Sequence, residues 1–374
     1  MSAPADGRLR VLYFYWSLKF DTGSPKVLVS MIDALDRARV VPYFWAVGEG
    51  PLVRELVRRD VALLEGPAGE VSWRRPVEAL RRVIGKVRAL RRARIGLLHI
   101  NEFGWNHDLA LAAWLLRIPV VLHVHNPLTV DRNNLHRLIA SRVLFVSRAH
   151  MQQTGHFHRV ASRARVLHNP IDVGYYASGR SLRAELGIGE GDVVVIAIGQ
   201  IVPRKGIDVL LEAAALLLPA QARLHFLVVG PEKASHAGYP AELRARAAAP
   251  ELGGRFRFLG ARADVPDLLA SADIFALPTR DEPFGLVVAE AMAASLPVVT
   301  TNIGGIPEVV GDSDAGVLLD PDDVAGFAEA IGRLAASPEE RARRGARGKR
   351  RVEREFGFGV FREQLARVYA EAVR

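Results

Sequence analysis

Short apolar runs alternate with amphipathic stretches along the whole chain, and this pattern predicts parallel β-sheets covered by helices on both faces. The pattern restarts near residue 192, after the irregular segment 169–176. We therefore expect an α/β protein with two doubly wound, Rossmann-like domains that face a central cleft and bind ligand at the carboxyl ends of their strands. The expected strands are 11–15, 41–47, 97–100, 120–124 and 143–146 in the first half, and 193–198, 224–229, 256–259, 274–277 and 297–300 in the second.

Length and composition agree with two globular domains. The chain has 374 residues, of which 49% are hydrophobic and 24% charged, and this length exceeds that of a single ordinary core. The absence of cysteine excludes disulfides, thiolate metal sites and a cysteine nucleophile. Residues 1–8 lack the apolar core of a signal peptide, and Arg117 and Pro119 interrupt the most apolar stretch, 109–124. We expect a soluble, cytoplasmic protein.

Charge is divided unevenly between the two halves. Residues 1–170 contain 26 Lys and Arg against 13 Asp and Glu, whereas the remaining residues contain 24 against 28. This asymmetry indicates an anionic partner for the first half, such as a membrane surface, a phosphorylated acceptor or nucleic acid. Only six of the 50 cations are lysines, a skew that also fits a compositional habit of the source.

Glu282 and Glu290 are the most informative pair of residues. Pro283 and Gly285 mark a turn, and the apolar run from residue 286 to residue 294 predicts a helix that begins between the two acids. The free N–H groups of a helix N-terminus attract phosphate, and carboxylates accept hydrogen bonds from sugar hydroxyls. A nucleotide-sugar fits this arrangement. The spacing alone fits equally well a helix with one acid favoured by the dipole and one solvated acid.

Other motifs point to no metal and no required cofactor. The sequence contains neither the dinucleotide-binding Gly-x-Gly-x-x-Gly fingerprint nor a Walker loop. Asp312 and Asp314 have the spacing of a divalent-metal site, but such acids in a glycine-flanked turn are more often solvated. His123 and His125 share one strand face without a nearby third ligand, so we expect no metal there.

The second half closely resembles the retaining GT-B-fold glycosyltransferases of family 4 (glycosyl transferases group 1). The resemblance rests on the run FLGARADVPDLLASADIFALPTRDEPFGLVVAEAMAASLPVVTTNIGGIPEVV from residue 258, together with GQIVPRKG from residue 199 and VLHNPID from residue 166. It is dense over residues 166–320 and looser over the first half. It implies that residues 1–170, joined by a C-terminal helix 358–374, bind the acceptor, and that residues 171–357 bind the nucleotide-sugar.

The resemblance implies three catalytic residues. Glu282 would hold donor-sugar hydroxyls near the reacting face, Lys205 would neutralise the departing diphosphate, and His125 would lie near the transferred sugar. Glu290 would accept hydrogen bonds from the ribose hydroxyls. The implied donor-binding set is Gly23, Ser24, Gln200, Arg204, Lys205, Phe284, Gly285, Leu286 and Glu290. Such a site would use a UDP- or GDP-linked sugar as co-substrate and move the sugar, with retained configuration, to an acceptor hydroxyl.

Three residues depart from the family pattern. Gln200 stands where an arginine usually contacts the diphosphate, and we hypothesise that Arg204 compensates for the lost charge. Ser24 replaces the second glycine of the loop after the first strand, which puts close approach to the phosphates in doubt. Ser295 replaces a glycine at a helix end, where a left-handed residue would cost about 1 kcal/mol.

The acceptor site is less distinct in the sequence. We nominate Asn101, Glu102, Trp105 and His107, which follow a predicted strand, as residues that line it. The acceptor would be a lipid, a saccharide or a small-molecule alcohol.

Residues 74–94 predict a basic amphipathic helix, with nine cations, one acid and one apolar face formed by Val77, Leu80, Val83, Ile84, Val87 and Leu90. A core-packed helix with a solvated arginine face explains this pattern, and so does reversible binding to an anionic membrane surface with a lipid-linked acceptor.

Two further classes of function remain open at this point. A nucleotide-sugar epimerase shares the two-domain architecture, and a protein that binds the donor without turnover would explain Gln200. A nucleic-acid-binding protein would explain the charge, but it leaves the Glu282 region unused, and stacking aromatic residues are not interleaved with the cations. We therefore expect no nucleic-acid partner.

Overall fold

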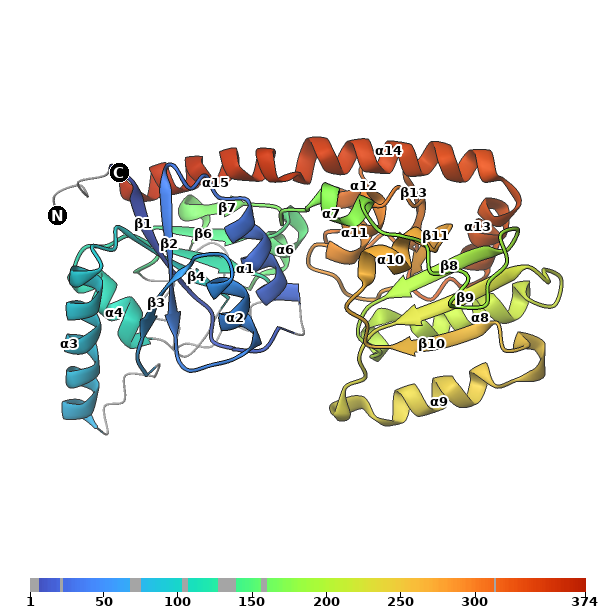
Figure 1. Cartoon of the computed structure of the whole chain (residues 1–374), viewed down its shortest axis with the longest axis horizontal. Coiled ribbons are helices and arrows are strands. Elements are labelled where there is room, and N and C mark those ends of the chain that lie inside the picture. Colours follow the sequence, from blue (N-terminus) through green and yellow to red (C-terminus); the bar gives the residue numbers. More distant parts are fainter. Residues whose placement is uncertain are drawn as a thin grey trace. The chain divides into compact units, whose positions relative to one another are not determined.

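The computed structural model describes residues 7–20, 23–67, 75–102, 107–126, 139–155, 160–312 and 314–374. The chain divides into two compact units, of which unit 1 comprises Met1–Pro170 with Phe358–Arg374 and unit 2 comprises Ile171–Gly357. Each unit contains one parallel sheet with helices around it (Figure 1). The predicted α/β fold with two doubly wound parallel sheets is confirmed.

The sheet of unit 1 has seven strands in the order β3-β2-β1-β4-β5-β6-β7, and every neighbouring pair is parallel. The first and last strands in this order are short and lie at the edges. The strands are β1 (Leu9–Phe14), β2 (Val40–Ala46), β3 (Ala62–Glu65), β4 (Leu97–Asn101), β5 (Val120–Val124), β6 (Arg142–Phe145) and β7 (Ala164–Val166).

Helices cover both faces of this sheet because the strand side chains alternate between two buried clusters. Val11 and Tyr13 of β1 belong to one cluster, whereas Leu12 and Phe14 belong to the other. The first cluster includes side chains of α1, α2 and α15, and the second includes side chains of α3 and α4. The helices of unit 1 are α1 (Gly23–Asp33), α2 (Pro51–Val57), α3 (Pro76–Arg92), α4 (His107–Leu115), α6 (Arg148–Gln153) and α15 (Phe358–Val373).

Helix α15 completes unit 1 from the far end of the sequence. Tyr369 is buried, and its hydroxyl lies 2.9 Å from the hydroxyl of Tyr13 and 2.8 Å from Nδ1 of His99. These bonds satisfy polar groups that would otherwise be costly inside the core. Unit 1 is therefore built from two separate parts of the sequence.

The sheet of unit 2 has six parallel strands in the order β10-β9-β8-β11-β12-β13. The strands are β8 (Val193–Ile198), β9 (Leu224–Val229), β10 (Phe256–Gly260), β11 (Ile274–Leu277), β12 (Val298–Thr301) and β13 (Gly316–Leu319). The helices are α7 (Val173–Ala177), α8 (Ile207–Leu217), α9 (Gly238–Ala247), α10 (Val265–Ala270), α11 (Leu286–Ala293), α12 (Ile306–Val310), α13 (Val324–Ala336) and α14 (Pro338–Phe356).

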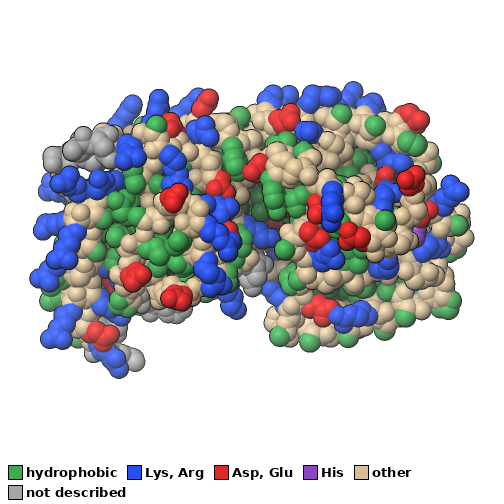
Figure 2. All heavy atoms as spheres, viewed as in Figure 1, with side chains coloured by type: hydrophobic (Ala, Val, Ile, Leu, Met, Phe, Trp, Pro, Cys, Tyr) green, Lys and Arg blue, Asp and Glu red, His purple; other side chains and the backbone are tan. Residues whose placement is uncertain are grey.

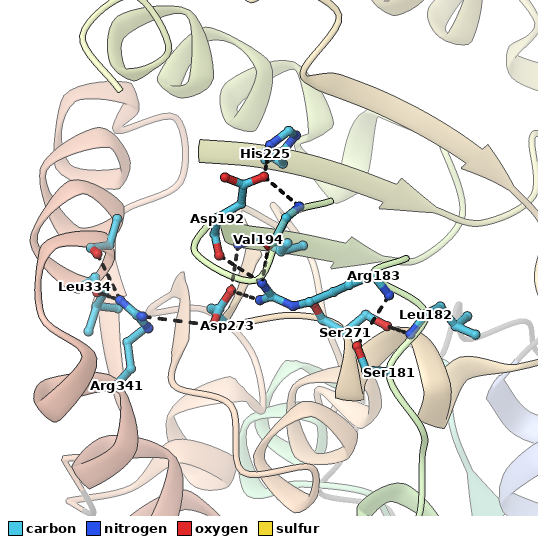
Figure 3. Close-up of polar contacts among 12 residues, drawn as sticks. Ser181, Leu182, Arg183, Asp192, Val194, His225, Ser271, Asp273, Leu334 and Arg341 are labelled. Carbon is cyan, nitrogen blue, oxygen red and sulfur yellow. Dashed lines mark hydrogen bonds and ion pairs between the residues drawn. The ribbon is translucent and has the colours of Figure 1, made fainter. Parts of the chain in front are cut away.

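A polar cluster fastens the amino ends of β8 and β11 (Figure 3). Arg183 forms an ion pair with Asp273 and donates to the carbonyl oxygens of Ser271 and Asp192, at 3.1 and 2.9 Å. Asp273 also accepts from the backbone N–H of Val194 at 2.8 Å. This cluster lies at the amino ends of the strands, whereas an α/β sheet binds its ligand at the carboxyl ends. We therefore assign it a structural role.

Helix α3 buries only part of the apolar face predicted for residues 74–94. Its buried residues include Val83, Leu90 and Lys86, whereas Val77, Leu80 and Ile84 are 62%, 60% and 40% exposed. Lys86 is drawn inward because its Nζ lies 2.7 Å from Oδ2 of the fully buried Asp108 and 5.2 Å from the Trp45 ring. The helix therefore presents three apolar side chains outward among arginines, at an edge where Figure 2 shows many basic side chains.

Candidate active site

The loop that carries Lys205 is fixed by a close backbone approach. The short 3₁₀ segment Pro203–Lys205 follows β8 and ends at Gly206, whose φ is 66°. A Cβ atom at this glycine would lie 1.8 Å from the carbonyl oxygen of Pro278, so only glycine fits. Lys205 is consequently held beside the end of β11 and is only 6% exposed.

The loop that carries Glu282 is packed equally tightly against another backbone segment. A Cβ atom on Gly304 would lie 2.0 Å from the carbonyl oxygen of Glu282, and one on Gly305 would lie 2.5 Å from that of Pro283. The backbone N–H of Gly305 donates to the Glu282 carbonyl at 2.9 Å. The two glycines after β12 therefore support the loop after β11.

Lys205 and Glu282 meet between these two loops. The Nζ atom of Lys205 lies 2.5 Å from Oε2 of Glu282, and the backbone N–H of Gly285 donates to Oε1 at 3.3 Å. Burial raises the pKa of Glu282, but the charge and hydrogen bond of Lys205, with Arg204 and Gly285, bring that pKa below its usual value. Glu282 is therefore an ionised carboxylate at neutral pH.

Helix α11 begins at Leu286, as the apolar pattern predicts, after Gly285 in the left-handed region with a φ of 102°. The side chain of Phe284 is buried, with its ring 5.6 Å from that of Phe356. Glu290 lies on this helix and is 7% exposed, and its Oε1 accepts from the Tyr176 hydroxyl at 2.7 Å. The sequence did not single out Tyr176, which lies 114 positions away.

Gln200, which departs from the family pattern, precedes the Lys205 loop, and Arg204, which we expect to compensate for it, lies within this loop. Gln200 follows β8 and is half-buried, while Arg204 is exposed and its Nη1 lies 3.4 Å from the Asp281 carbonyl. The loop itself is held by Arg280, whose Nη1 donates to the Pro203 carbonyl at 2.6 Å while Nη2 contacts Asp208 at 2.6 Å. Arg280 was also missed in the sequence.

In unit 1, four of the predicted site residues come together with Asn126. Ser24, in the first turn of α1 after Gly23, donates to Oε2 of Glu102 at 2.8 Å, and Asn126 donates to the same oxygen at 2.8 Å. Asn101 donates to the Ser24 carbonyl at 3.2 Å and lies 2.8 Å from Nε2 of His125. Ser24 therefore supplies a hydroxyl that ties α1 to the ends of β4 and β5.

Glu102 is a buried residue in a strained conformation. Its φ is 85°, unusual for any residue other than glycine, and it is 6% exposed. Burial raises its pKa, while hydrogen bonds from Ser24, Asn126 and His125 oppose the shift. Strain of this kind at the end of a parallel strand is typical of functional sites.

Burial also keeps the nearby histidines neutral. It lowers the pKa of His125 well below the usual value, and the neighbouring His123, His99 and His150 lower it further. His123 is fully buried, and its pKa is about 3.

Two further residues were predicted to line the acceptor site. His107 begins α4, five residues after Glu102. Trp105 lies outside the described residues.

Asp314, which has the spacing of a metal site with Asp312, instead forms ion pairs with Arg343, Arg344 and Arg347. Within the described parts of the chain, no group of acids and histidines is arranged to hold a metal ion.

Two family models match the chain, one over each half. Residues 179–351 match the family Glycosyl transferases group 1, and residues 22–175 match Glycosyltransferase Family 4. The chain carries a group 1 glycosyltransferase domain.

Related sequences agree with this assignment. The chain is 37% identical over 226 residues to a D-inositol 3-phosphate glycosyltransferase of Salinispora tropica, covering 57% of this chain and 47% of the relative. It is 29% identical over 191 residues to the lipopolysaccharide core biosynthesis mannosyltransferase LpsB of Rhizobium meliloti, covering 50% and 54%. The chain thus spans about half the length of the curated relatives it matches.

Solved structures confirm the fold of the group 1 glycosyltransferases. Anabaena Alr3699/HepE in complex with UDP and glucose superposes with a TM-score of 0.82 at 23% identity, covering 97% of this chain and all of that one. A glycosyltransferase from Rickettsia africae gives a TM-score of 0.85 at 16% identity, covering 98% and 99%. These likenesses establish the two-domain GT-B architecture.

Proposed function

We propose that this protein is a retaining glycosyltransferase that moves a sugar from a UDP- or GDP-linked donor to an acceptor hydroxyl. The carrying observation is the buried pair of Lys205 and Glu282 beside the start of α11, where a cation, a carboxylate and backbone N–H groups converge. Such a set matches a ligand with both phosphate and hydroxyl groups. The epimerase and the inactive donor-binding protein are less favoured, because the relatives are named as glycosyltransferases.

In the proposed reaction, the bond between the anomeric carbon and the diphosphate oxygen breaks, and its electron pair leaves with the phosphate. The acceptor oxygen forms the new bond on the same face, and its proton passes to the departing phosphate. Lys205, with Arg204 nearby, stabilises the negative charge that develops there, so no metal is required. Glu282 orients the sugar through its hydroxyls, and residues of unit 1 bind the acceptor.

A donor panel tests this function. The protein is incubated with UDP-glucose, UDP-N-acetylglucosamine and GDP-mannose, and nucleotide release is measured with and without candidate lipid, saccharide and alcohol acceptors. We expect one donor to be consumed, its sugar to appear on an acceptor with the same anomeric configuration by NMR, and Glu282→Gln to lose at least 100-fold in rate. Glu251→Gln, at an exposed acid of unit 2, is the matched control.

Two other outcomes would contradict the proposal. Conversion of the donor sugar without an acceptor indicates an epimerase. Donor binding with neither release nor conversion indicates an inactive binding protein.

We further propose that α3 brings the protein to an anionic membrane surface on the cytoplasmic side, where a lipid-linked acceptor would be available. The support is the outward set Val77, Leu80 and Ile84, flanked by the exposed Arg81 and Arg88. Apolar side chains of this kind enter the lipid interface while arginines contact anionic headgroups. No helix in the described ranges has the length and apolarity needed to cross a bilayer.

A further inference from the structure

Tyr176 contacts Glu290, the acid that the family resemblance associates with the ribose hydroxyls. Its hydroxyl donates to Oε1 of Glu290 at 2.7 Å, from helix α7 to helix α11. Glu290 is buried, with 7% of its surface exposed, and Tyr176 is half-buried. A hydrogen bond to a buried carboxylate restricts the rotation of that group and is stronger than a bond between neutral partners.

The tyrosine is itself firmly held. Helix α7 is capped by Asp172, whose Oδ1 accepts from the backbone N–H of Tyr175 at 2.9 Å. Burial raises the pKa of Tyr176 above its usual range, and the charge and hydrogen bond of Glu290 raise it further. The phenol therefore keeps its proton at neutral pH and remains a donor to Glu290.

A carboxylate can accept several hydrogen bonds at once, because it offers about four lone-pair positions when ionised. The Tyr176 hydroxyl donates to one oxygen of Glu290, Oε1. Ribose carries two neighbouring hydroxyls that can each donate to one carboxylate. A carboxylate of fixed orientation discriminates between ligands with and without these hydroxyls better than a rotating one, because an unmatched buried group is left unpaired.

We propose that Tyr176 is the positioning residue that orients Glu290 and thereby sets the selectivity of the donor site for ribonucleotides over deoxyribonucleotides. This inference rests on the proposed function, since it assigns Glu290 to the ribose of a nucleoside diphosphate. It adds a residue outside the Glu282–Glu290 motif to the determinants of donor specificity.

Calorimetric titration with UDP or GDP, whichever binds, and with its 2′-deoxy and 3′-deoxy analogues tests the proposal. The measured quantity is the ratio of the Kd of each deoxynucleotide to the Kd of the ribonucleotide. We expect a ratio of at least tenfold for the wild-type protein, with the larger effect at whichever hydroxyl contacts Glu290, and about threefold or less for Tyr176→Phe. Glu290→Gln shows the ratio that remains when the carboxylate charge is removed.

Tyr175→Phe is the matched control. Tyr175 lies on the same helix, its ring centroid is 5.1 Å from that of Tyr176, and it is 49% exposed. This variant should keep the wild-type ratio. The thermal midpoint of each variant shows that the fold is retained.

Each other result has a distinct meaning. A Tyr176→Phe protein that keeps the wild-type Kd ratio overturns the inference, even if its affinity for ribo- and deoxynucleotides falls in equal proportion. Tighter ribonucleotide binding by this variant would mean that Tyr176 competes with ribose for Glu290, which also overturns it. Failure of the wild-type protein to bind either UDP or GDP would instead refute the proposed function.

Discussion

The Nζ atom of Lys205 lies 2.5 Å from Oε2 of Glu282, although the two residues are 77 positions apart and come from different loops of unit 2. One is expected to bind the diphosphate of a donor and the other its sugar hydroxyls. Each neutralises the other inside a buried site. A bound donor must therefore supply anionic and hydroxyl groups that replace part of this mutual attraction.

Removing Lys205 should destabilise unit 2 and abolish donor binding. In Lys205→Met, the buried Glu282 carboxylate loses its cation, and we expect unfolding free energy to fall by about 3–5 kcal/mol. The pKa of Glu282 should rise as well, because Lys205 is a main cause of its lowering. Scanning calorimetry and nucleotide titration measure the two effects. The double variant Lys205→Met/Glu282→Leu should recover most of the lost stability but should not bind nucleotide. If the double variant were as unstable as Lys205→Met, this account would be contradicted.

Unit 1 should lose stability as the pH falls below 6.5. Burial lowers the pKa of His99, His123 and His125 below the usual 6.5, so below this pH the unfolded chain binds protons that the folded unit does not. Stability then falls by up to about 1.4 kcal/mol per pH unit for each histidine. All five tryptophans lie in residues 1–170, so urea unfolding followed by tryptophan fluorescence at pH 7.5, 6.5 and 5.5 reports on unit 1.

Replacement of one buried histidine provides the control for this pH dependence. His123→Leu removes one of the three titrating groups, so the slope of unfolding free energy against pH should fall by the equivalent of about one proton. Stability that is unchanged between pH 7.5 and 5.5 would be incompatible with neutral buried histidines.

Gly304→Ala should displace the Glu282 loop. The added Cβ would lie 2.0 Å from the Glu282 carbonyl oxygen, and the φ of 55° adds about 1–2 kcal/mol of backbone strain. We expect a stability loss above about 2 kcal/mol and at least a tenfold weaker affinity for the nucleotide. Gly359→Ala is the control, because nothing lies within 4 Å of its Cβ position. The same small effect at both glycines would exclude a supporting role for Gly304.

Ser295 offers a site at which the protein can be made more stable. Its φ is 64°, as expected for a residue that replaces a glycine at a helix end, and Ser295→Gly should raise stability by about 0.5–1 kcal/mol. The opposing variant is Gly345→Ala, whose Cβ would lie 1.9 Å from the Ser295 carbonyl oxygen. Thermal unfolding of both variants should show shifts of opposite sign.

The outward residues of α3 should control membrane binding. In flotation assays at low salt, we expect the protein to float with vesicles that contain phosphatidylglycerol and not with pure phosphatidylcholine. Leu80→Ser/Ile84→Ser should reduce the bound fraction several-fold without loss of stability, because both side chains are exposed. Val57→Ser, at another exposed apolar position of unit 1, is the control. Equal flotation with neutral and anionic vesicles would refute an electrostatic contribution.

Hydrophobic patterning predicted ten strands to within two residues, including the edge strand β10, but missed three others. These are β3, β7 and β13, and each lies at the edge of its sheet and is short and only partly buried. An edge strand has one neighbour and needs few apolar residues, so it leaves a weak signal. Patterning predicted the helix at α3 but not the burial of Lys86, which depends on Asp108 of another helix.

In the candidate site, too, local sequence patterns predicted the features set by neighbouring residues but not the contacts between residues far apart in the sequence. The start of α11 between Glu282 and Glu290 follows from local turn and helix signals, and the structure places it there. The contact of Tyr176 with Glu290 joins residues 114 positions apart, and no local pattern marks it. Ser24 was expected to hinder a phosphate loop, yet its hydroxyl has a structural partner in Glu102.

The discontinuity of unit 1 has a consequence for synthesis on the ribosome. Unit 2 is one continuous segment and can acquire its native structure as soon as residue 357 has left the exit tunnel. The sheet of unit 1 emerges first, but the side chains of Phe361, Leu365 and Tyr369 that cover one of its faces arrive only after the whole of unit 2. The nascent N-terminal half therefore exposes an incomplete core while unit 2 is being synthesised, and a chaperone would bind it during that interval.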